Sequence, residues 1–225
     1  MLVSRRFNSS SAHSGHPRLT HFDNDGHARM VDVAEKQPTK RTATATGRIY
    51  IPPAAYELVA SSYPVRNVHG EISNPLDRAK AKARRKGDVL AVAQLAAIMG
   101  CKRTSDLIPL CHPLAISHVS VTLTPEIPNV LSGGVRDVPQ NPRHSILCTA
   151  TVSCEGQTGV EMEALTAVSV GLLTVWDMLK AVAGKEMEIG EIIVTNKTGG
   201  RGGDFVRQFG GRRCSQTMVQ LPDTL

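Results

Sequence analysis

The fold is decided by residues 145–184, SILCTATVSCEGQTGVEMEALTAVSVGLLTVWDMLKAVAG. The first ten residues alternate apolar and polar side chains with period two, which predicts a strand at 145–154. From about Gly159 to Ala183 the apolar residues recur with helical spacing, and Thr158 and Glu161 have the spacing of a capping box that would start this helix. Gly184 is placed to end it. One half-buried strand is therefore followed by one long helix.

The flanking sequence contains both patterns again, without a regular strand–helix–strand repeat. Strands are predicted at 41–51, 117–124 and 191–194, and a helix is predicted at 88–99, which Gly100 would end. A short helical pattern follows Pro52-Pro53, and the stretches 61–85 and 125–143 predict long loops. Strands and helices interspersed in this way indicate the α+β class, with an antiparallel sheet packed against helices.

The composition limits what the chain can be. Hydrophobic residues make up 41% and charged residues 20% of the 225 residues, as in a folded globular domain. No apolar run reaches the roughly 18 residues of a membrane-spanning helix. The net charge of +6 is concentrated at the ends, where residues 1–18 hold three arginines without an acid and residues 205–225 hold three arginines and one acid. The near-neutral body does not favour nucleic-acid binding.

The N-terminal 18 residues are rich in Arg and Ser and lack acids, which is typical of an organellar targeting peptide, although a charged tail without a targeting role would look the same. We therefore divide the chain into a mitochondrial presequence at 1–18, one domain at 19–206 and a basic C-terminal tail at 207–225. The expected location is the mitochondrial matrix, with the cytoplasm as the alternative. The five cysteines form neither CxxC nor CxxxCxxC, which argues against zinc, a disulfide framework and an iron–sulfur cluster.

Two segments near the middle of the chain carry side chains suited to chemistry. Lys86 precedes a helix that Asp88 would cap, so Lys86 either meets a phosphate at the helix N-terminus or is simply solvated. His112 lies between two prolines in CKRTSDLIPLCHPL, residues 101–114. A chain stiffened by prolines is a good platform for an imidazole that binds or transfers protons, although a lone histidine is usually structural.

The long helix carries acids near its start and an acid–base pair near its end. Glu161 is explained as a cap, and Glu163 gains from the helix dipole. Asp177 and Lys180 are three residues apart and can form a surface ion pair, which would contribute almost nothing to stability.

Positions 163, 166, 170, 173, 177 and 180 form one stripe along this helix, with an apolar middle and charged ends. About 21 Å of helix separates Glu163 from Asp177 if the helix is continuous. A site that uses both ends would have to be shared between two chains, and the apolar middle would suit a two-fold contact.

Four segments together resemble the cyclic pyranopterin monophosphate synthase family, called MoaC in bacteria. They are LTHFDNDGHARMVDV, KGDVLAVAQLAAIMGCKRTSDLIPLCHPL, TGVEMEALTAVSVGLLTVWDMLK and KTGGRGGDF, in collinear order over residues 19–205. The resemblance implies a lyase that converts (8S)-3′,8-cyclo-7,8-dihydroguanosine 5′-triphosphate to cyclic pyranopterin monophosphate with release of pyrophosphate, in molybdenum cofactor (molybdopterin) biosynthesis. It also implies a ferredoxin-like α+β fold and a hexamer built from dimers with shared active sites.

Carried over residue by residue, the resemblance makes Asp177 the catalytic acid/base, with Lys86 and Lys180 as its basic partners and His112 as a further catalytic residue. The substrate-binding residues that it implies are Arg41, Leu110, Cys111, His112, Met162, Glu163 and Lys197. No metal ligands and no cofactor are expected, apart from Mg²⁺ arriving with the triphosphate, for which the sequence holds no dedicated carboxylate cluster.

The chain departs from the family at Arg201 and Gly202, where Lys and Ser are usual, and its stretches 61–85 and 128–143 are longer than in compact bacterial members. Arg keeps the charge of Lys but not its geometry, so the contacts of that loop need not be the family's. Two other classes stay open: an RNA-associated protein that uses the Arg/Gly-rich C-terminus, and a catalytically idle partner of the upstream radical SAM enzyme. The expected partners are the small-molecule substrate and further copies of the chain, without nucleic acid or membrane.

Overall fold

The computed structural model describes residues 19–60, 88–128, 143–200 and 202–208. Several sequence predictions therefore lie outside the described residues: Lys86, Arg201, the presequence 1–18, the loop 61–85, nearly all of the longer loop 128–143 and the tail beyond residue 208.

The centre of the fold is a five-stranded antiparallel sheet with the order β2-β3-β1-β4-β5. Its strands are β1 (Thr39–Ile51), β2 (Ile116–Glu126), β3 (His144–Gly156), β4 (Glu188–Thr198) and β5 (Phe205–Val206). The first four strands and the helices between them follow the β-α-β-β-α-β connection of a ferredoxin-like fold. The predicted α+β class is confirmed, and β5, which the sequence did not predict, adds two residues at the edge of β4.

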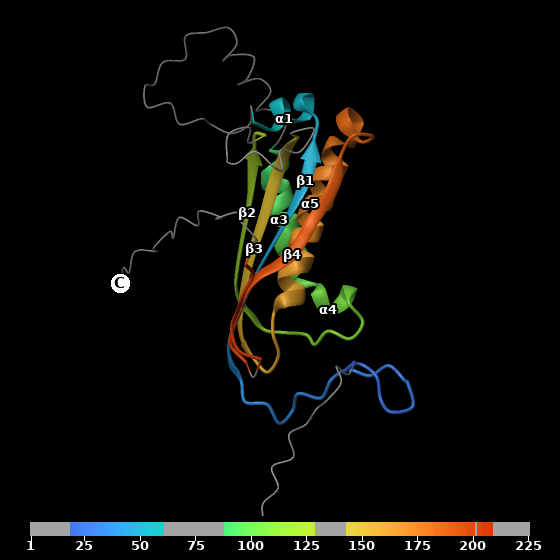
Figure 1. The fold of residues 1–225 in the computed structure, drawn as a ribbon, viewed down its shortest axis with the longest axis vertical. Helices are drawn as coiled ribbons and strands as arrows, with labels where there is room; N and C mark the ends of the chain where they lie inside the picture. The colour runs from blue at the N-terminus through green and yellow to red at the C-terminus, as the bar shows by residue number, and fades with distance from the viewer. Residues whose placement is uncertain (1–18, 61–87, 129–142, 201, 209–225) are drawn as a thin grey trace, which may run out of the picture.

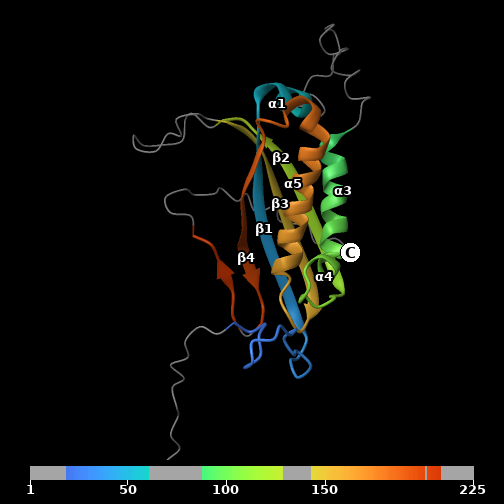
Figure 2. The ribbon, with the colours of Figure 1, turned by 90° about the vertical axis from the view of Figure 1, so that its right-hand side faces the viewer.

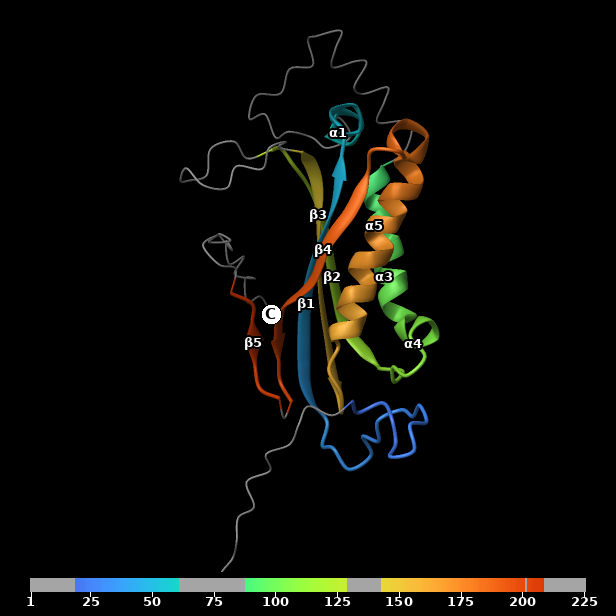
Figure 3. The same ribbon diagram turned by 45° about the vertical axis from the view of Figure 1, so that its right-hand side comes forward.

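The helices cover one face of this sheet. The long helices α3 (Val89–Lys102) and α5 (Glu161–Ala183) lie side by side, with α1 (Pro53–Ala60) at one end and α4 (Thr104–Leu107) at the other (Figures 1 and 2). No described helix covers the opposite face (Figure 3). The core lies between the layers, because alternate residues of β1 such as Ala43, Ala45 and Ile49 are buried while the threonines between them face outward.

The two long helices approach each other closely at Gly100. The sequence predicted that Gly100 would end α3, and this is wrong: the helix continues to Lys102, and Arg103 is its C-cap. Gly100 is buried, and a Cβ there would lie 2.7 Å from Cγ2 of Val170 on α5. The absence of a side chain at this position serves the helix contact and not a helix end.

The start of α5 also differs from its prediction. Its N-cap is Val160, which has no side-chain capping hydrogen bond. Because Thr158 lies two residues ahead of the N-cap, the reciprocal bonds of a capping box with Glu161 cannot form. The other predicted caps are confirmed: Gly184 is the C-cap of α5, and the Asp88 carboxylate accepts from the first-turn amides of α3 at 3.0 Å.

Among the described helices, α5 alone is long and apolar enough to cross a membrane, with a mean hydropathy of 1.5 over 18 residues. Its apolar side chains Ala164, Val168, Leu172 and Val175 are buried in the hydrophobic core under the sheet. The core helix of a globular domain has this composition, and we interpret α5 as such a helix.

Candidate active site

Most of the predicted site residues meet at one end of the sheet. There β1 begins, β3 and β4 end, α5 begins, and the loop 108–115 leads from α4 into β2 (Figure 1). Arg41 on β1 is paired with Cys154 of β3, and Lys197 on β4 is paired with Ala43 of β1. The predicted residues found at this end are Arg41, Leu110, Cys111, His112, Met162, Glu163 and Lys197.

Arg41 is held in place by the backbone and by a glycine turn. Its Nε donates to the carbonyl oxygen of Gly156 at 3.3 Å, and its guanidinium lies where a Cβ on Gly200 would overlap it. Gly199 and Gly200 have left-handed φ angles of +86° and +84°, a conformation that favours glycine. The amide of Gly199 donates to the Asp204 carboxylate at 2.9 Å. The glycine-rich segment after β4 therefore forms a turn that leaves room for Arg41.

A cavity of about 570 Å³ lies beside Arg41. It is bounded by the segment before β1, the connection from β3 to α5 and the turn after β4, and its lining includes Lys36, Gln157, Thr158, Gly159, Gly200 and Gly202. Its volume is in the range of small-molecule sites. Sequence reasoning missed Lys36, and the signal that could have found it is a lysine three residues after the MVDV segment.

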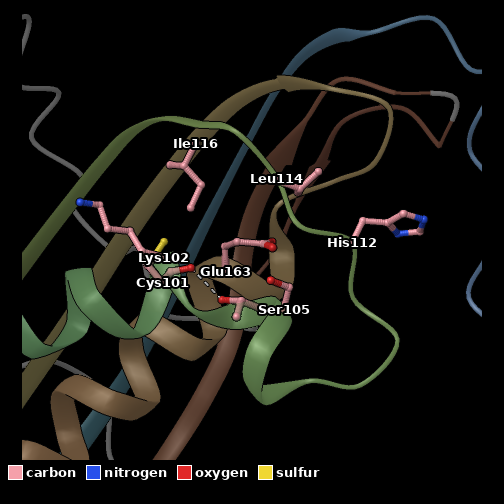
Figure 4. Close-up of a pocket in the computed structure, with 8 residues that line it drawn as sticks. Cys101, Lys102, Ser105, His112, Leu114, Ile116 and Glu163 are labelled. Carbon is pink, nitrogen blue, oxygen red and sulfur yellow. Dashed lines mark hydrogen bonds between the residues drawn. The ribbon is translucent and has the colours of Figure 1, made fainter.

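Glu163 is a buried carboxyl beside this end of the sheet, with only 4% of its surface exposed. Burial raises the pKa of Glu163, and the charge of the nearby Glu161 raises it further, against a lowering by a backbone hydrogen bond. Figure 4 shows the Glu163 carboxyl group pointing between Ser105 and Leu114. Burial therefore favours the neutral form of this carboxyl more than it would be favoured in an exposed glutamate.

Cys111 and His112 lie on the loop 108–115 and are half-buried. The ring of His112 points away from Glu163 (Figure 4), although both residues line the same small pocket. Burial raises the pKa of Cys111, and the nearby Glu163 raises it further. The thiolate is therefore disfavoured, and Cys111 is not arranged as a nucleophile.

Glu161 pairs with Lys197 instead of capping α5. Its Oε1 lies 3.3 Å from Nζ of Lys197, and about a third of each side chain is exposed. The pair links the start of α5 to the end of β4. The sequence did not include Glu161 among the site residues, because the capping-box spacing explained it locally.

Asp177 and Lys180 stand apart from this end. Because α5 continues without interruption from residue 161 to 183, Asp177 lies roughly 21 Å along the helix axis from Glu163. Nζ of Lys180 and Oδ1 of Asp177 are 2.5 Å apart, which confirms the predicted ion pair, and both side chains are exposed. The structure thus places the predicted residues in two separate groups.

The stripe of α5 residues that runs from Glu163 to Lys180 is exposed to solvent over only part of its length. Glu163 and Thr166 are buried, and Val170 faces Gly100 of α3, whereas Leu173 is 59% exposed. The predicted apolar contact surface therefore begins in the second half of α5.

One group of described residues, Asp23, Asp25 and His27, has the spacing of metal ligands. The Asp23 carboxylate accepts from the amides of Asp25 and His27, and the His27 bond is the largest cause that lowers the pKa of Asp23. The group is largely exposed on the segment before β1. Exposed acidic groups are common without an ion, and we assign no metal site to them.

Residues 30–200 match the MoaC family, and this span contains every predicted site residue. The chain belongs to the MoaC family. Its similar relatives include the cyclic pyranopterin monophosphate synthases of Chloroflexus aurantiacus strains J-10-fl and Y-400-fl. Each is 45% identical over 192 residues, which is 85% of this chain and 96% of the relative.

The family resemblance inferred from the four sequence segments is therefore confirmed. In this MoaC-family chain, the match ends just before Arg201 and Gly202, the two positions that differ from the usual pattern. The roles of the individual residues stay predictions, and the geometry of the two groups is the basis on which they can be tested.

Proposed function

We propose that this MoaC-family chain is a cyclic pyranopterin monophosphate synthase. It is a lyase that converts 3′,8-cyclo-7,8-dihydroguanosine 5′-triphosphate to cyclic pyranopterin monophosphate with release of pyrophosphate, in molybdenum cofactor biosynthesis. The observation that carries the proposal lies at one end of the sheet, where Lys36, Arg41 and Glu35 line a cavity of about 570 Å³ and where Lys197 and the buried carboxyl of Glu163 are also found.

The residues divide the chemistry between them. Arg41 and Lys197 bind the anionic part of the substrate, because cations stabilise a triphosphate and the charge that develops as pyrophosphate leaves. Met162, Glu163 and the Leu110–His112 segment contact the rest of the substrate. Proton transfer during ring and cyclic phosphate formation falls to Asp177 and His112, with Lys86 and Lys180 as the basic partners of Asp177.

Each active site is built from two copies of the chain. Asp177 and Lys180 lie too far from Glu163 along α5 for one small substrate to reach both groups in one copy. Two α5 helices packed antiparallel about a two-fold axis would bring the end of one beside the start of the other. The outer faces of α3 and α5 support such a contact, because they expose Val92, Leu95, Met99 and Leu173. The assembly we propose is a hexamer that is built from such dimers.

Turnover of the cyclic dihydro-GTP substrate by the purified chain tests the function directly. Asp177→Asn keeps the shape of the side chain and removes proton transfer, so the rate should fall roughly 10²-fold or more while folding persists. Asp25→Asn is the matched control, because Asp25 is exposed on the segment before β1 and should leave the rate unchanged. Near-normal turnover by Asp177→Asn would remove Asp177 from the mechanism.

The reaction that we propose needs no resident cofactor, and Mg²⁺ enters only with the triphosphate. Addition of EDTA should then lower the rate through substrate binding and be reversed by Mg²⁺ alone. The substrate itself must come from a radical reaction that joins the ribose to the base, which links this chain to an upstream radical SAM enzyme.

The location that we propose is the mitochondrial matrix, on the basis of the acid-free Arg/Ser composition of residues 1–18. Residues 1–30 fused to a reporter should carry it to mitochondria. A reporter that stays diffuse in the cytosol would favour the cytoplasmic alternative.

A further inference from the structure

Glu161 has no part in the roles assigned above, although it forms an ion pair with Lys197 at the edge of the cavity. Glu161 Oε1 and Lys197 Nζ are 3.3 Å apart. The carboxylate of Glu161 lies against Gly159, and the ammonium of Lys197 lies 3.6 Å from the position of a Cβ on Gly202. Gly159 and Gly202 both line the cavity beside Arg41. The pair therefore lies at the rim of the cavity, between two of its walls.

The direction of the Glu161 side chain is not explained by the helix that it starts. The N-cap of α5 is Val160, which has no side-chain capping hydrogen bond, so Glu161 is not one half of a capping box. Its carboxylate instead folds back into the space that a side chain at residue 159 would fill, since a Cβ on Gly159 would overlap Oε2. The chain leaves this space open, and the Glu161 carboxylate uses it to reach Lys197.

We infer that Glu161 is a positioning residue that holds the Lys197 ammonium at the rim of the cavity, ready for the anionic part of the substrate. This role rests on the proposed function. A lysine side chain has many rotamers, and fixing one of them before the substrate arrives removes that entropy cost from the reaction. The Glu161 carboxylate also offsets the charge of Lys197. Glu161 therefore raises the reaction rate by orienting the ammonium and not by attracting the substrate.

A double-mutant cycle tests this role. Glu161→Ala should lower kcat roughly tenfold through the misplaced ammonium, with little change or a decrease in KM, because a negative charge beside the substrate is also lost. In the Lys197→Ala background the same change should have no further effect on kcat. An additive effect there would show that Glu161 does not act through Lys197 and would overturn the proposal.

Two further variants sharpen the test. Glu161→Gln keeps an oxygen acceptor at the same reach and should recover part of the lost kcat, whereas equal losses for Ala and Gln would contradict positioning by contact. Glu155→Ala, which removes an exposed carboxylate at the same end of the sheet, should leave kcat unchanged. A loss of kcat in this control equal to that of Glu161→Ala would reduce the effect to overall charge and overturn the proposal.

Gly159→Ala tests whether the Glu161 carboxylate needs the space that the missing side chain of Gly159 leaves open. It should lower kcat in the wild-type chain by displacing Glu161 and should cost nothing more in the Glu161→Ala background. A further loss there would show that Gly159 serves the cavity and not Glu161, against our inference.

Turnover by the wild-type chain separates this role from the proposed function. If the wild-type chain turns over no substrate, both fail, whereas normal turnover with additive effects refutes the role of Glu161 alone. Chemical unfolding of the four members of the double-mutant cycle (wild type, Glu161→Ala, Lys197→Ala and the double variant), without substrate, should show that residues 161 and 197 are energetically coupled. The absence of this coupling would also refute the role.

Discussion

At the scale of single residues, Glu163 is a carboxyl group that is almost fully buried, with 4% of its surface exposed. Burial raises its pKa above the ordinary 4.5. Below pH 4.5 the group is protonated in both the folded and the unfolded chain, so it costs no stability. As the pH rises above 4.5 the unfolded chain ionises first, the folded chain binds more protons, and the free energy of unfolding falls until Glu163 ionises in the folded state.

We predict from this that Glu163→Gln stabilises the protein at pH 8 and changes little at pH 4. The gain at pH 8 should be about 1.4 kcal/mol for each unit by which the pKa is raised. Urea unfolding at the two pH values measures it, with the exposed Glu155→Gln as a control that should show no such pH dependence. An equal change at both pH values would mean that ionisation of Glu163 does not limit stability.

Gly200 offers a second prediction at this scale. Its φ of +84° disfavours a side chain, and a Cβ at this position would displace the Arg41 guanidinium. Gly200→Ala should cost about 1–2 kcal/mol from the left-handed backbone alone, and it should also raise KM by displacing Arg41.

The matched control for Gly200 is Gly203. It has φ +67°, but no atom lies within 4 Å of a Cβ at this position. Gly203→Ala should therefore show the same loss in denaturant unfolding with an unchanged KM. If both variants raise KM alike, backbone strain and not the contact with Arg41 is the cause.

The residues themselves differ in how far the sequence could reveal them. Arg41, Glu163 and Lys197 came from the family resemblance, and the structure places them together. Glu161 was assigned to a cap because a local pattern explained it, and its pairing with Lys197 depends on a strand that is 36 positions away in sequence. Contacts of this kind are set by the register between elements, which no local pattern contains.

At the scale of elements, the contact between α3 and α5 depends on the missing side chain of Gly100. A Cβ at this position would lie 2.7 Å from Cγ2 and 2.8 Å from Cβ of Val170, and the stiff branched side chain of Val170 cannot move aside easily. Gly100→Ala should gain about 1 kcal/mol of helix propensity but lose about 1–3 kcal/mol to overpacking, so the net effect is destabilising.

The measurement for Gly100 is denaturant unfolding of the single and double variants. The loss should shrink when Val170→Ala removes the obstructing methyl groups. Gly190→Ala on β4, where a Cβ would meet nothing within 4 Å, is the control and should be close to neutral. A stabilised Gly100→Ala would mean that propensity outweighs the contact.

The elements were easier to predict than their ends. Alternation and helical spacing located β1, β2, β3, α3 and α5, because each presents a continuous apolar face to one core. The predicted roles of Gly100 and Glu161 at helix ends were wrong for a common reason. Each residue fits a local pattern that is typical of a helix end, but in the structure each serves a tertiary contact: Gly100 with Val170 and Glu161 with Lys197. The two-residue strand β5 and the four-residue helix α4 are too short to show any period.

At the scale of the whole molecule, the separation of the two residue groups is the basis of the proposal that each active site is shared between two copies. His112 and Glu163 line one small pocket at the start of α5, and the exposed pair Asp177–Lys180 lies roughly 21 Å along the same helix. In the shared-site proposal, each group is one half of a site, and a two-fold axis would combine the halves into two complete sites per dimer.

Two inactive variants should then rescue each other when their subunits are mixed. If Asp177 comes from one chain and His112 from its neighbour, then a dimer of Asp177→Asn with His112→Ala contains one site without a mutated side chain. Random pairing makes half of the dimers mixed, and half of the sites in those are intact. Dissociation and reassembly of an equal mixture should therefore recover up to about a quarter of full activity, as a two-fold shared site requires.

A second mixture shows whether the rescue depends on where the residues lie. His112→Ala mixed with Arg41→Ala should recover nothing, because both side chains belong to the same end and every site would lack one of them. Exchange of subunits must be followed with a label in both mixtures, so that a lack of rescue cannot come from a lack of mixing. Proven exchange without rescue between Asp177→Asn and His112→Ala would place both residues in one copy's site, or exclude one of them from catalysis. Because α5 is continuous over the distance between them, that result would leave Asp177 without a role in the reaction at the sheet end.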